Sequence, residues 1–408
     1  MKYKFKLDDD IWKKAEFCAR CGNCRTVHAE QIMGQETGQQ CPSGSHYFFE
    51  SYYPSGRNYA AVAYQRGQLE WSDRMVDVFY SCTTCGFCQY TCERTNQLHP
   101  TDIIRWMRSK AVEAGVGPLP AQKAIVQNLQ TYDNPWGQPR SRRSNWTKGL
   151  DFKIKDLSTD TEKAEVLFYP GCTYVMDPKL VKNIKSIARL MHEAGVDFGI
   201  LGNSEKCCGS TAFNLGYVNV LEKYGSENIE TFNALGVKTI VTPCAGCYNT
   251  IGHVYSQLGE LKYNVQHGVE MLADLIKQKK LKPKYKVNKT VTYHDPCHLG
   301  RHAKIFDPPR EILKAIPGLK LVEMPRKREY AFCCGGGGGV RTGKPEFAQA
   351  TAARRIKEAE GTGAALLSTA CPFCMQNLGD YMDNVGSPME LVDVVELLNE
   401  SIFGPIKK

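Results

Sequence analysis

The sequence predicts an α+β multidomain protein in which a helical N-terminal domain precedes two copies of one α/β domain. Three observations predict this organisation. Cysteine groups recur at nearly constant offsets along the later part of the chain. Short β-like runs alternate with amphipathic helical stretches around those groups, which is typical of a parallel sheet. Two further cysteine triplets lie among helical stretches nearer the N-terminus.

Cysteine positions and composition divide the 408 residues into four parts. We expect the helical domain at 1–118, the first α/β copy at 164–283 and the second at 284–408. Residues 119–163 are enriched in Pro, Gly, Ser and Arg with weak periodicity. This composition predicts a loop or an extended connection between the helical domain and the first copy.

Five cysteines are repeated in each α/β copy. The first copy has Cys172, then Cys207 and Cys208 before Gly209, then Cys244 and Cys247; the second has Cys297, then Cys333 and Cys334 before Gly335, then Cys371 and Cys374. Matched cysteines lie 125 to 127 residues apart, and so small a drift marks a duplicated unit. Each lone cysteine and each C-x-x-C follows a β-like run, at 166–171, 238–242, 291–296 and 365–369. We therefore expect the cysteines on loops at the strand ends, where parallel sheets place their sites.

The number of cysteines limits what each copy can hold. Zinc takes four ligands, usually as two C-x-x-C pairs, and has no use for adjacent cysteines plus a fifth. A disulfide framework is typical of short secreted chains, and this chain is long and lacks a secretory signal. Thiolates suit iron, and five of them exceed the four that a cubane takes, so an unusual iron–sulfur cluster is favoured over zinc.

The N-terminal third contains Cys18-x-x-Cys21-x-x-Cys24, a Cys41-Pro42 pair, and Cys82-x-x-Cys85-x-x-Cys88-x-x-x-Cys92. The last run has the spacing of bacterial two-cluster ferredoxins, in which the fourth cysteine binds the other cluster. By that rule one [4Fe–4S] cubane takes Cys18, Cys21, Cys24 and Cys92, and the other takes Cys82, Cys85, Cys88 and Cys41. Sixteen residues separate Cys24 from Cys41, which makes Cys41 the weakest assignment. Zinc at each triplet is the alternative.

Helical signals surround these triplets and predict an α-helical ferredoxin-like domain. A helix is expected over residues 8–17 with Asp8 as its N-cap, another over residues 71–80, and a third after His99 with Thr101 able to cap it. Near the C-terminus, Ser387 and Glu390 have capping-box spacing, which predicts a helix through Leu398.

Overall composition fits a globular protein, with 42% hydrophobic and 23% charged residues. No apolar run approaches the roughly 20 residues of a membrane helix, so we expect a cytoplasmic protein, with membrane association through a partner left open. The net charge of +9 is spread out, and its one dense patch is Arg140 to Arg143. Without a nucleic-acid motif this patch is interpreted as a solvated or partner-facing surface.

Three non-cysteine residues are weak catalytic candidates. His294 and His298 flank Cys297 and could donate a proton to a leaving thiolate, although hydrogen bonding near a cluster is the plainer role. His298 and His302 are four residues apart, a spacing that also suits a metal pair. Arg341 follows five glycines, Gly335 to Gly339, and could meet an anionic substrate group. The glycines fit close approach of the backbone to a bulky cluster or substrate better than dinucleotide binding, because no β-like run directly precedes them and no fitting acidic residue follows.

The repeated cysteine pattern resembles the CCG domain of heterodisulfide reductases, and the whole chain resembles their D-type subunit. That resemblance implies two α/β (Rossmann-like) CCG domains related by a pseudo-twofold axis, each holding a noncubane [4Fe–4S] cluster on its five cysteines. It also implies that a disulfide binds between the facing clusters and is split by one electron from each. All eighteen cysteines are then cluster ligands, and no flavin or haem site of its own is expected.

Two hypotheses of function follow from the resemblance. The first is an enzyme subunit that reduces or forms a disulfide such as a heterodisulfide. The second is a purely electron-transferring subunit, like the BamD-type subunit of benzoyl-CoA reductase complexes. Expected partners are a flavin-containing HdrA-like subunit or a membrane cytochrome b-type subunit, together with other redox proteins of a larger complex and a small-molecule disulfide or thiol. No nucleic acid is expected.

Overall fold

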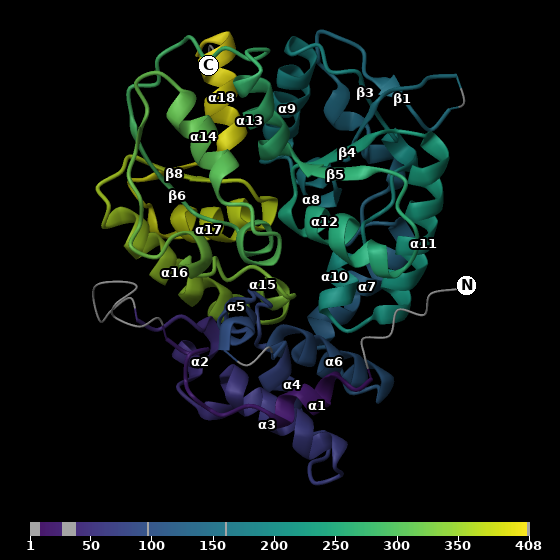
Figure 1. Cartoon of the computed structure of the whole chain (residues 1–408), viewed down its shortest axis with the longest axis vertical. Helices are drawn as coiled ribbons and strands as arrows, with labels where there is room; N and C mark the ends of the chain where they lie inside the picture. Colours follow the sequence, from purple (N-terminus) through teal and green to yellow (C-terminus); the bar gives the residue numbers. More distant parts are fainter. Residues whose placement is uncertain (1–8, 27–37, 96–97, 160, 406–408) are drawn as a thin grey trace.

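The computed structural model describes residues 9–26, 38–95, 98–159 and 161–405. Two α/β domains lie side by side, and a helical N-terminal region packs beneath both of them (Figure 1). The predicted order of a helical part followed by two parallel-sheet domains is confirmed. Within the described residues, no helix is both long and apolar enough to cross a membrane.

The N-terminal region is helical throughout. Its helices are α1 (Ile11–Glu16), α2 (Pro42–Tyr47), α3 (Pro54–Gln65), α4 (Asp73–Tyr80), α5 (Phe87–Thr95) and α6 (Pro100–Glu113), with a 3₁₀ turn, η2, at Glu50–Tyr52. Phe79, Ile103, Ile104 and Met107 are fully buried in a small core between these helices. Arg108 of α6 is also fully buried, and its guanidinium satisfies carbonyls from several separate segments. A small core is therefore supplemented by polar bonds to the rest of the molecule.

The helix starts differ in detail from the sequence expectations. Asp8, the expected first cap, lies outside the described residues. The helix expected over 71–80 begins at Asp73, because the hydroxyl of Ser72 accepts the Met75 N–H as a true N-cap. The expected cap at Thr101 is wrong: Thr101 is the second residue of α6, and its hydroxyl lies 3.8 Å from Cys88 Sγ.

The first α/β domain has a five-stranded parallel sheet in the order β1-β3-β2-β4-β5. Its strands are β1 (Lys155–Asp156), β2 (Val166–Phe168), β3 (Phe198–Ile200), β4 (Thr239–Thr242) and β5 (Asn264–His267). Its helices are α8 (Cys172–Met176), α9 (Val181–Glu193), α10 (Ser210–Asn214), α11 (Val218–Leu235), α12 (Ala245–Asn249) and α13 (Gly268–Lys277). Turns η5 (Gly202–Ser204), η6 (Thr250–Val254) and η7 (Tyr255–Gln257) complete the domain.

The second α/β domain repeats this topology in a four-stranded parallel sheet, β7-β6-β8-β9. Its strands are β6 (Thr290–Tyr293), β7 (Lys320–Leu321), β8 (Leu366–Thr369) and β9 (Glu390–Asp393). Its helices are α14 (Asp307–Ala315), α15 (Val340–Gly343), α16 (Pro345–Glu360), α17 (Pro372–Val385) and α18 (Val394–Phe403), with η8 (His298–His302) and η9 (Arg328–Tyr330). Strands β6 to β9 occupy the places of β2 to β5, so the duplication predicted from cysteine offsets extends to four strands of each sheet, and β1 lies outside it.

The two domains share one hydrophobic core. Helix α9 of the first domain packs against α18 of the second, and α13 of the first packs against α14 of the second. Since α14 is the repeat of α9 and α18 is the repeat of α13, the contacts are reciprocal, as a pseudo-twofold axis requires. Tyr174 donates to the Asp393 carboxylate across the interface at 2.7 Å, and Asn183 donates to the same oxygen at 3.3 Å.

Two further sequence expectations are wrong. Residues 119–163 are not a plain loop: they form α7 (Pro120–Tyr132), the turns η3 (Arg140–Arg142) and η4 (Asn145–Thr147), and strand β1. Helix α7 forms because Val126 and Leu129 pack into the core of the first domain. At the C-terminus, residues 390–393 are strand β9, and the capping box of α18 is Asp393 with Glu396, not Ser387 with Glu390.

We predict that Asp393 makes stability depend on pH. Burial raises the pKa of Asp393 to about 7, so its contribution is complete below the ordinary carboxyl pKa and is lost as pH rises through about 7. Asp393→Asn keeps a good cap. The melting temperature of the anaerobic protein should therefore fall less between pH 5 and pH 8 in this variant than in the wild type. Asp383→Asn, at an exposed ion pair with Lys179, is the control and should keep the wild-type slope; an equal slope in Asp393→Asn would contradict the prediction.

Candidate metal centres

All eighteen cysteines are free thiols, so the disulfide framework weighed from the sequence does not form. They gather in four groups. The outer four-cysteine group (Cys18, Cys21, Cys24, Cys92) lines one small cavity near the surface. The inner four-cysteine group (Cys41, Cys82, Cys85, Cys88) lines a second cavity, with Cys24 at its edge. The structure thus brings together both sets expected from the ferredoxin spacing, including the displaced Cys41 and the exchanged Cys92.

The first five-cysteine group (Cys172, Cys207, Cys208, Cys244, Cys247) is buried beyond the carboxyl ends of β2, β3 and β4, with Cys172 at the start of α8, Cys247 within α12 and the other three on loops. Its sulfurs form a chain of contacts: Cys172 with Cys207, Cys207 with Cys208, Cys208 with Cys247 at 3.4 Å, and Cys247 with Cys244. Each loop follows a strand whose residues are held in register by parallel neighbours, so the five sulfurs converge from distant parts of the chain.

The second five-cysteine group (Cys297, Cys333, Cys334, Cys371, Cys374) has the same chain of contacts in the second domain. Cys297 contacts Cys333, Cys333 contacts Cys334, Cys334 contacts Cys374, and Cys374 contacts Cys371. Every pair corresponds to a pair in the first five-cysteine group. The duplicated sequence therefore produces two matched thiol sites.

The chemistry of these donor sets fits iron–sulfur groups. The thiolate is the metal-binding form of cysteine, yet burial raises the pKa of Cys24, Cys41 and Cys92 to about 12. These three thiols favour the neutral form unless a cation compensates the charge of the thiolate, whereas contact with Cys207 lowers the pKa of Cys208 to about 6. Iron supplies that compensation, because a coordinating thiol is deprotonated outright.

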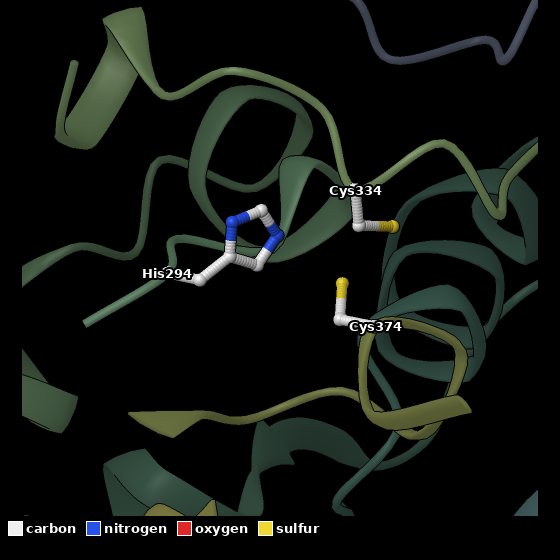
Figure 2. Close-up of side chains that lie close together, drawn as sticks. All are labelled: His294, Cys334 and Cys374. Atoms are coloured by element: carbon white, nitrogen blue, oxygen red, sulfur yellow. The ribbon is translucent and has the colours of Figure 1, made fainter. Parts of the chain in front are cut away.

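His294 lies beside the second five-cysteine group (Figure 2). One ring nitrogen of His294 and the sulfurs of Cys334 and Cys374 all lie within 4.8 Å of one another. Arg355 donates to Nδ1 of His294 at 3.0 Å, so Nε2 carries the proton and faces Cys334. Burial lowers the pKa of His294, which keeps the ring neutral. The structure therefore directs Nε2 of His294 toward the sulfurs of Cys334 and Cys374.

The other two candidate residues line a cavity of about 140 Å³ between the α/β domains. His298 is neutral there, because burial lowers its pKa to about 4, and its ring stacks edge-on against His302 at 4.6 Å. Arg341 reaches the same cavity but is paired with Asp380 at 2.6 Å. The walls are mainly apolar and include Ile125 and Trp136 from residues 119–163.

The inner four-cysteine group touches the second five-cysteine group directly. The thiols of Cys85 and Cys333 are hydrogen-bonded, and Cys333 Sγ also lies 3.5 Å from the hydroxyl of Thr83. The glycine run makes this approach possible: a Cβ on Gly337 would lie 2.6 Å from the Thr83 carbonyl oxygen, and one on Gly338 would lie 2.5 Å from that of Cys82. These two glycines therefore admit the backbone of the Cys82–Cys85 loop, and the predicted approach to a cluster or substrate stays a prediction.

Comparison with known proteins places the chain in a family. Residues 166–252 and 291–379 each match the cysteine-rich domain family CCG. Over 395 residues the chain is 36% identical to the D-type subunit of the dihydromethanophenazine:CoB–CoM heterodisulfide reductase of Methanosarcina mazei, covering 94% of this chain and 93% of that protein. The chain belongs to the family of heterodisulfide reductase D-type subunits.

Other relatives of this D-type chain are longer proteins. An iron–sulfur-binding oxidoreductase of Bacillus subtilis, FadF, is 37% identical over 331 residues, which is 80% of this chain and 46% of that protein. The EtfAB:quinone oxidoreductase of Syntrophomonas wolfei is 33% identical over 334 residues, which is 79% of this chain and 46% of that protein. The relatives are oxidoreductases, and this chain is an oxidoreductase subunit of the same kind. Its cysteine-rich domains and its family imply iron–sulfur clusters as cofactors.

Sequence reasoning missed Arg143 in this D-type chain. The patch of Arg140 to Arg143 was expected on the surface, yet Arg143 is only 2% exposed. Its guanidinium donates to Cys172 Sγ at 3.1 Å, to Glu205 at 2.6 Å and to the Asp133 carbonyl at 2.9 Å. No spacing rule signals such a contact, because it depends on α7 folding back over the first five-cysteine group.

We predict that Arg143 is far more important for stability than its neighbour in the same patch. Arg143→Met leaves the Glu205 carboxyl buried without its cation, which costs about 3–5 kcal/mol. The control, Arg140→Met, removes an exposed ion pair to Asp133 worth about 1 kcal/mol or less. Urea unfolding of the anaerobic proteins measures both losses. Equal losses in the two variants would show that the buried pair is not important.

Proposed function

We propose that this chain carries two [4Fe–4S] cubanes in an α-helical ferredoxin-like region and two noncubane [4Fe–4S] clusters in its CCG domains. The outer and inner four-cysteine groups would hold the cubanes, and the two five-cysteine groups the noncubane clusters. The clusters pass electrons to a small disulfide, which takes two electrons and two protons and leaves as two thiols, or they run the reaction in reverse.

The observation that carries this proposal is the line of contacts between the thiol groups. Cys24 lies at the edge of the inner four-cysteine group, and Cys85 of that group touches Cys333 of the second five-cysteine group. The outer four-cysteine group, the inner four-cysteine group and the second five-cysteine group adjoin one another in that order. This arrangement supports electron transfer from the surface toward the interior. The outer group is the natural entry point, because Cys21 is exposed.

Disulfide chemistry is favoured over pure electron transfer by the cavity at the second five-cysteine group. A carrier that served only a partner protein would gain nothing from a mainly apolar cavity of about 140 Å³ against four cysteines. The second candidate remains a D-type electron-transferring subunit of the BamD kind. In either case electrons come from a partner, which we propose is a flavin-containing A-type subunit or a membrane cytochrome b-type subunit.

Anaerobic purification with partners tests this function. Iron quantitation should give sixteen iron atoms per chain, as four [4Fe–4S] clusters require, and EPR should separate cubane from noncubane signals. Thiol release from a supplied disulfide would then support reductase activity. Full iron occupancy without thiol release from any disulfide would favour the electron-transferring subunit instead. Zinc bound by His294, Cys334 and Cys374 in place of iron would contradict both.

Paired cysteine variants test the ligand assignment. Cys334→Ser should abolish one noncubane EPR signal and leave the cubane signals. The matched change in the other domain, Cys208→Ser, should abolish the other noncubane signal. Identical, unchanged spectra in both variants would refute the role of the adjacent cysteines.

A glycine variant tests the close packing of the two centres. Gly337→Ala places a methyl group 2.6 Å from the Thr83 carbonyl, so the Cys82–Cys85 loop must move, at a cost of about 1–3 kcal/mol. We expect slower reduction of the noncubane clusters by the reduced cubanes in rapid-mixing experiments. Gly252→Ala is the control, since its nearest neighbour would be Val265 at an ordinary 3.5 Å. Unchanged reduction kinetics in Gly337→Ala would contradict the proposed route.

A further inference from the structure

The Arg143 guanidinium is in direct contact with a cysteine sulfur. Among the described residues, Arg143 is the only arginine or lysine that donates to a sulfur of either five-cysteine group, through Nη2 to Cys172 Sγ at 3.1 Å. Nη2 also donates to the Asp133 carbonyl at 2.9 Å, and Nη1 donates to the Glu205 carboxylate at 2.6 Å. The sulfur and the carboxylate are therefore held by different nitrogens of one guanidinium.

One donor of Arg143 has no acceptor in the described part of the chain. The Nε atom is buried and makes no hydrogen bond there, although the other nitrogens of the side chain are well bonded. A buried N–H without an acceptor is unfavourable. The sulfides of an iron–sulfur cluster are acceptors that the five thiols themselves do not supply. The unpaired Nε–H therefore fits a cluster bound against Cys172.

The second five-cysteine group has a different cation beside it. Arg301 is buried there, and its positive charge acts on Cys297 and Cys333. The same charge acts on Cys85 of the inner four-cysteine group. Its Nε and Nη1 donate to backbone, to the carbonyls of Cys85 and Ala331, and not to sulfur. The second group therefore shares one cation with a neighbouring centre and lacks the direct N–H to sulfur bond of the first.

The second five-cysteine group also adjoins another set of thiolates. Its Cys333 contacts Cys85 of the inner four-cysteine group, and a [4Fe–4S] cubane on four thiolates carries a net negative charge. Reduction adds negative charge to a cluster. A cation and N–H donors at its sulfurs therefore raise the reduction potential, and a neighbouring anion lowers it. Both differences between the groups favour an electron on the first.

We propose that Arg143 is a positioning residue that raises the reduction potential of the first five-cysteine group above that of the second and so sets the order in which they are reduced. This rests on the proposed function. One electron from the partner redox protein passes the second group and settles at the first. The next electron then reduces the second group, which lies beside the inner four-cysteine group. Each group holds one of the two electrons that the disulfide takes, and two protons from solvent complete the two thiols.

A redox titration of the intact anaerobic holoprotein, monitored by EPR, tests the order of reduction. The two noncubane signals are assigned by their loss in Cys208→Ser and Cys334→Ser. We expect the signal that depends on Cys208 to have the higher midpoint potential. Equal potentials or the reverse order would overturn the proposal. Wild-type protein without two noncubane signals would instead refute the proposed function, and the inference with it.

Two variants with opposite expected shifts separate this role from a purely structural one. Arg143→Lys keeps a cation for Glu205 but lacks the planar fork that also reaches Cys172, so the midpoint potential of the first group should fall. Glu205→Gln keeps the side-chain shape and removes the compensating carboxylate, so the same potential should rise. The control Arg140→Lys, at an exposed ion pair with Asp133, should change neither potential. An unchanged potential in Arg143→Lys, or shifts of the same sign in both variants, would overturn the proposal.

Isotope labelling of the wild-type protein tests the contact without a change of sequence. Arginine labelled with ¹⁵N in its guanidinium is incorporated, and pulsed EPR detects nitrogen coupled to each noncubane cluster. We expect ¹⁵N coupling in the signal of higher midpoint potential alone, with its loss in Arg143→Lys. This measurement also identifies the two signals where a cysteine variant fails to fold. Any other pattern of coupling would overturn the proposal.

Discussion

The structure depends on one electrostatic constraint: eighteen thiols are brought into four crowded groups, most of them out of water. Thiolates at such distances repel one another, so positive charge placed near them favours the thiolate form that binds metal. A buried guanidinium lies beside the inner four-cysteine group and beside each five-cysteine group. Arg57 stands by Cys41, Arg301 by Cys85 and Cys333, and Arg143 by Cys172. These guanidiniums lie beside the sulfurs only because the helices and loops that carry Arg57, Arg143 and Arg301 pack in defined positions.

Duplication supplies two equal sites, and the single-copy segments make them unequal. The N-terminal region touches the second five-cysteine group through Cys85, and the connection covers the first through Arg143. Among the described residues, neither contact has a counterpart related by the repeat. The two CCG domains are therefore not equivalent: the second five-cysteine group lies nearer the inner four-cysteine group and lines the cavity, whereas the first is covered.

Much of this architecture could be predicted from cysteine spacing. Regular offsets identified the repeat, and β-like runs before Cys172, Cys244, Cys297 and Cys371 placed the strands, because a parallel strand followed by a site loop is a local pattern. The exchanged pairing of Cys92 with the Cys18 triplet also matched the cavity in the structure.

What could not be predicted depends on distant contacts. Arg143 is polar and lies in a Pro-rich stretch, so its burial is visible only once Glu205 and Cys172 are placed around it. Helix α7 does carry apolar residues at helical spacing, including Val126 and Leu129, but the Pro, Gly and Arg residues that follow it dominate the composition of residues 119–163. Strand β9 was mistaken for a helix because Glu390 to Asp393 is short and pairs in parallel with β8.

Arg108 joins three parts of the chain. Its guanidinium donates to the carbonyls of Phe79 and Cys82 in the N-terminal region, Asn214 in the first α/β domain and Gly338 in the second. Moving the N-terminal region away from the two domains would deprive this buried guanidinium of acceptors, which is unfavourable. One side chain therefore helps to stabilise the docked arrangement of all three parts.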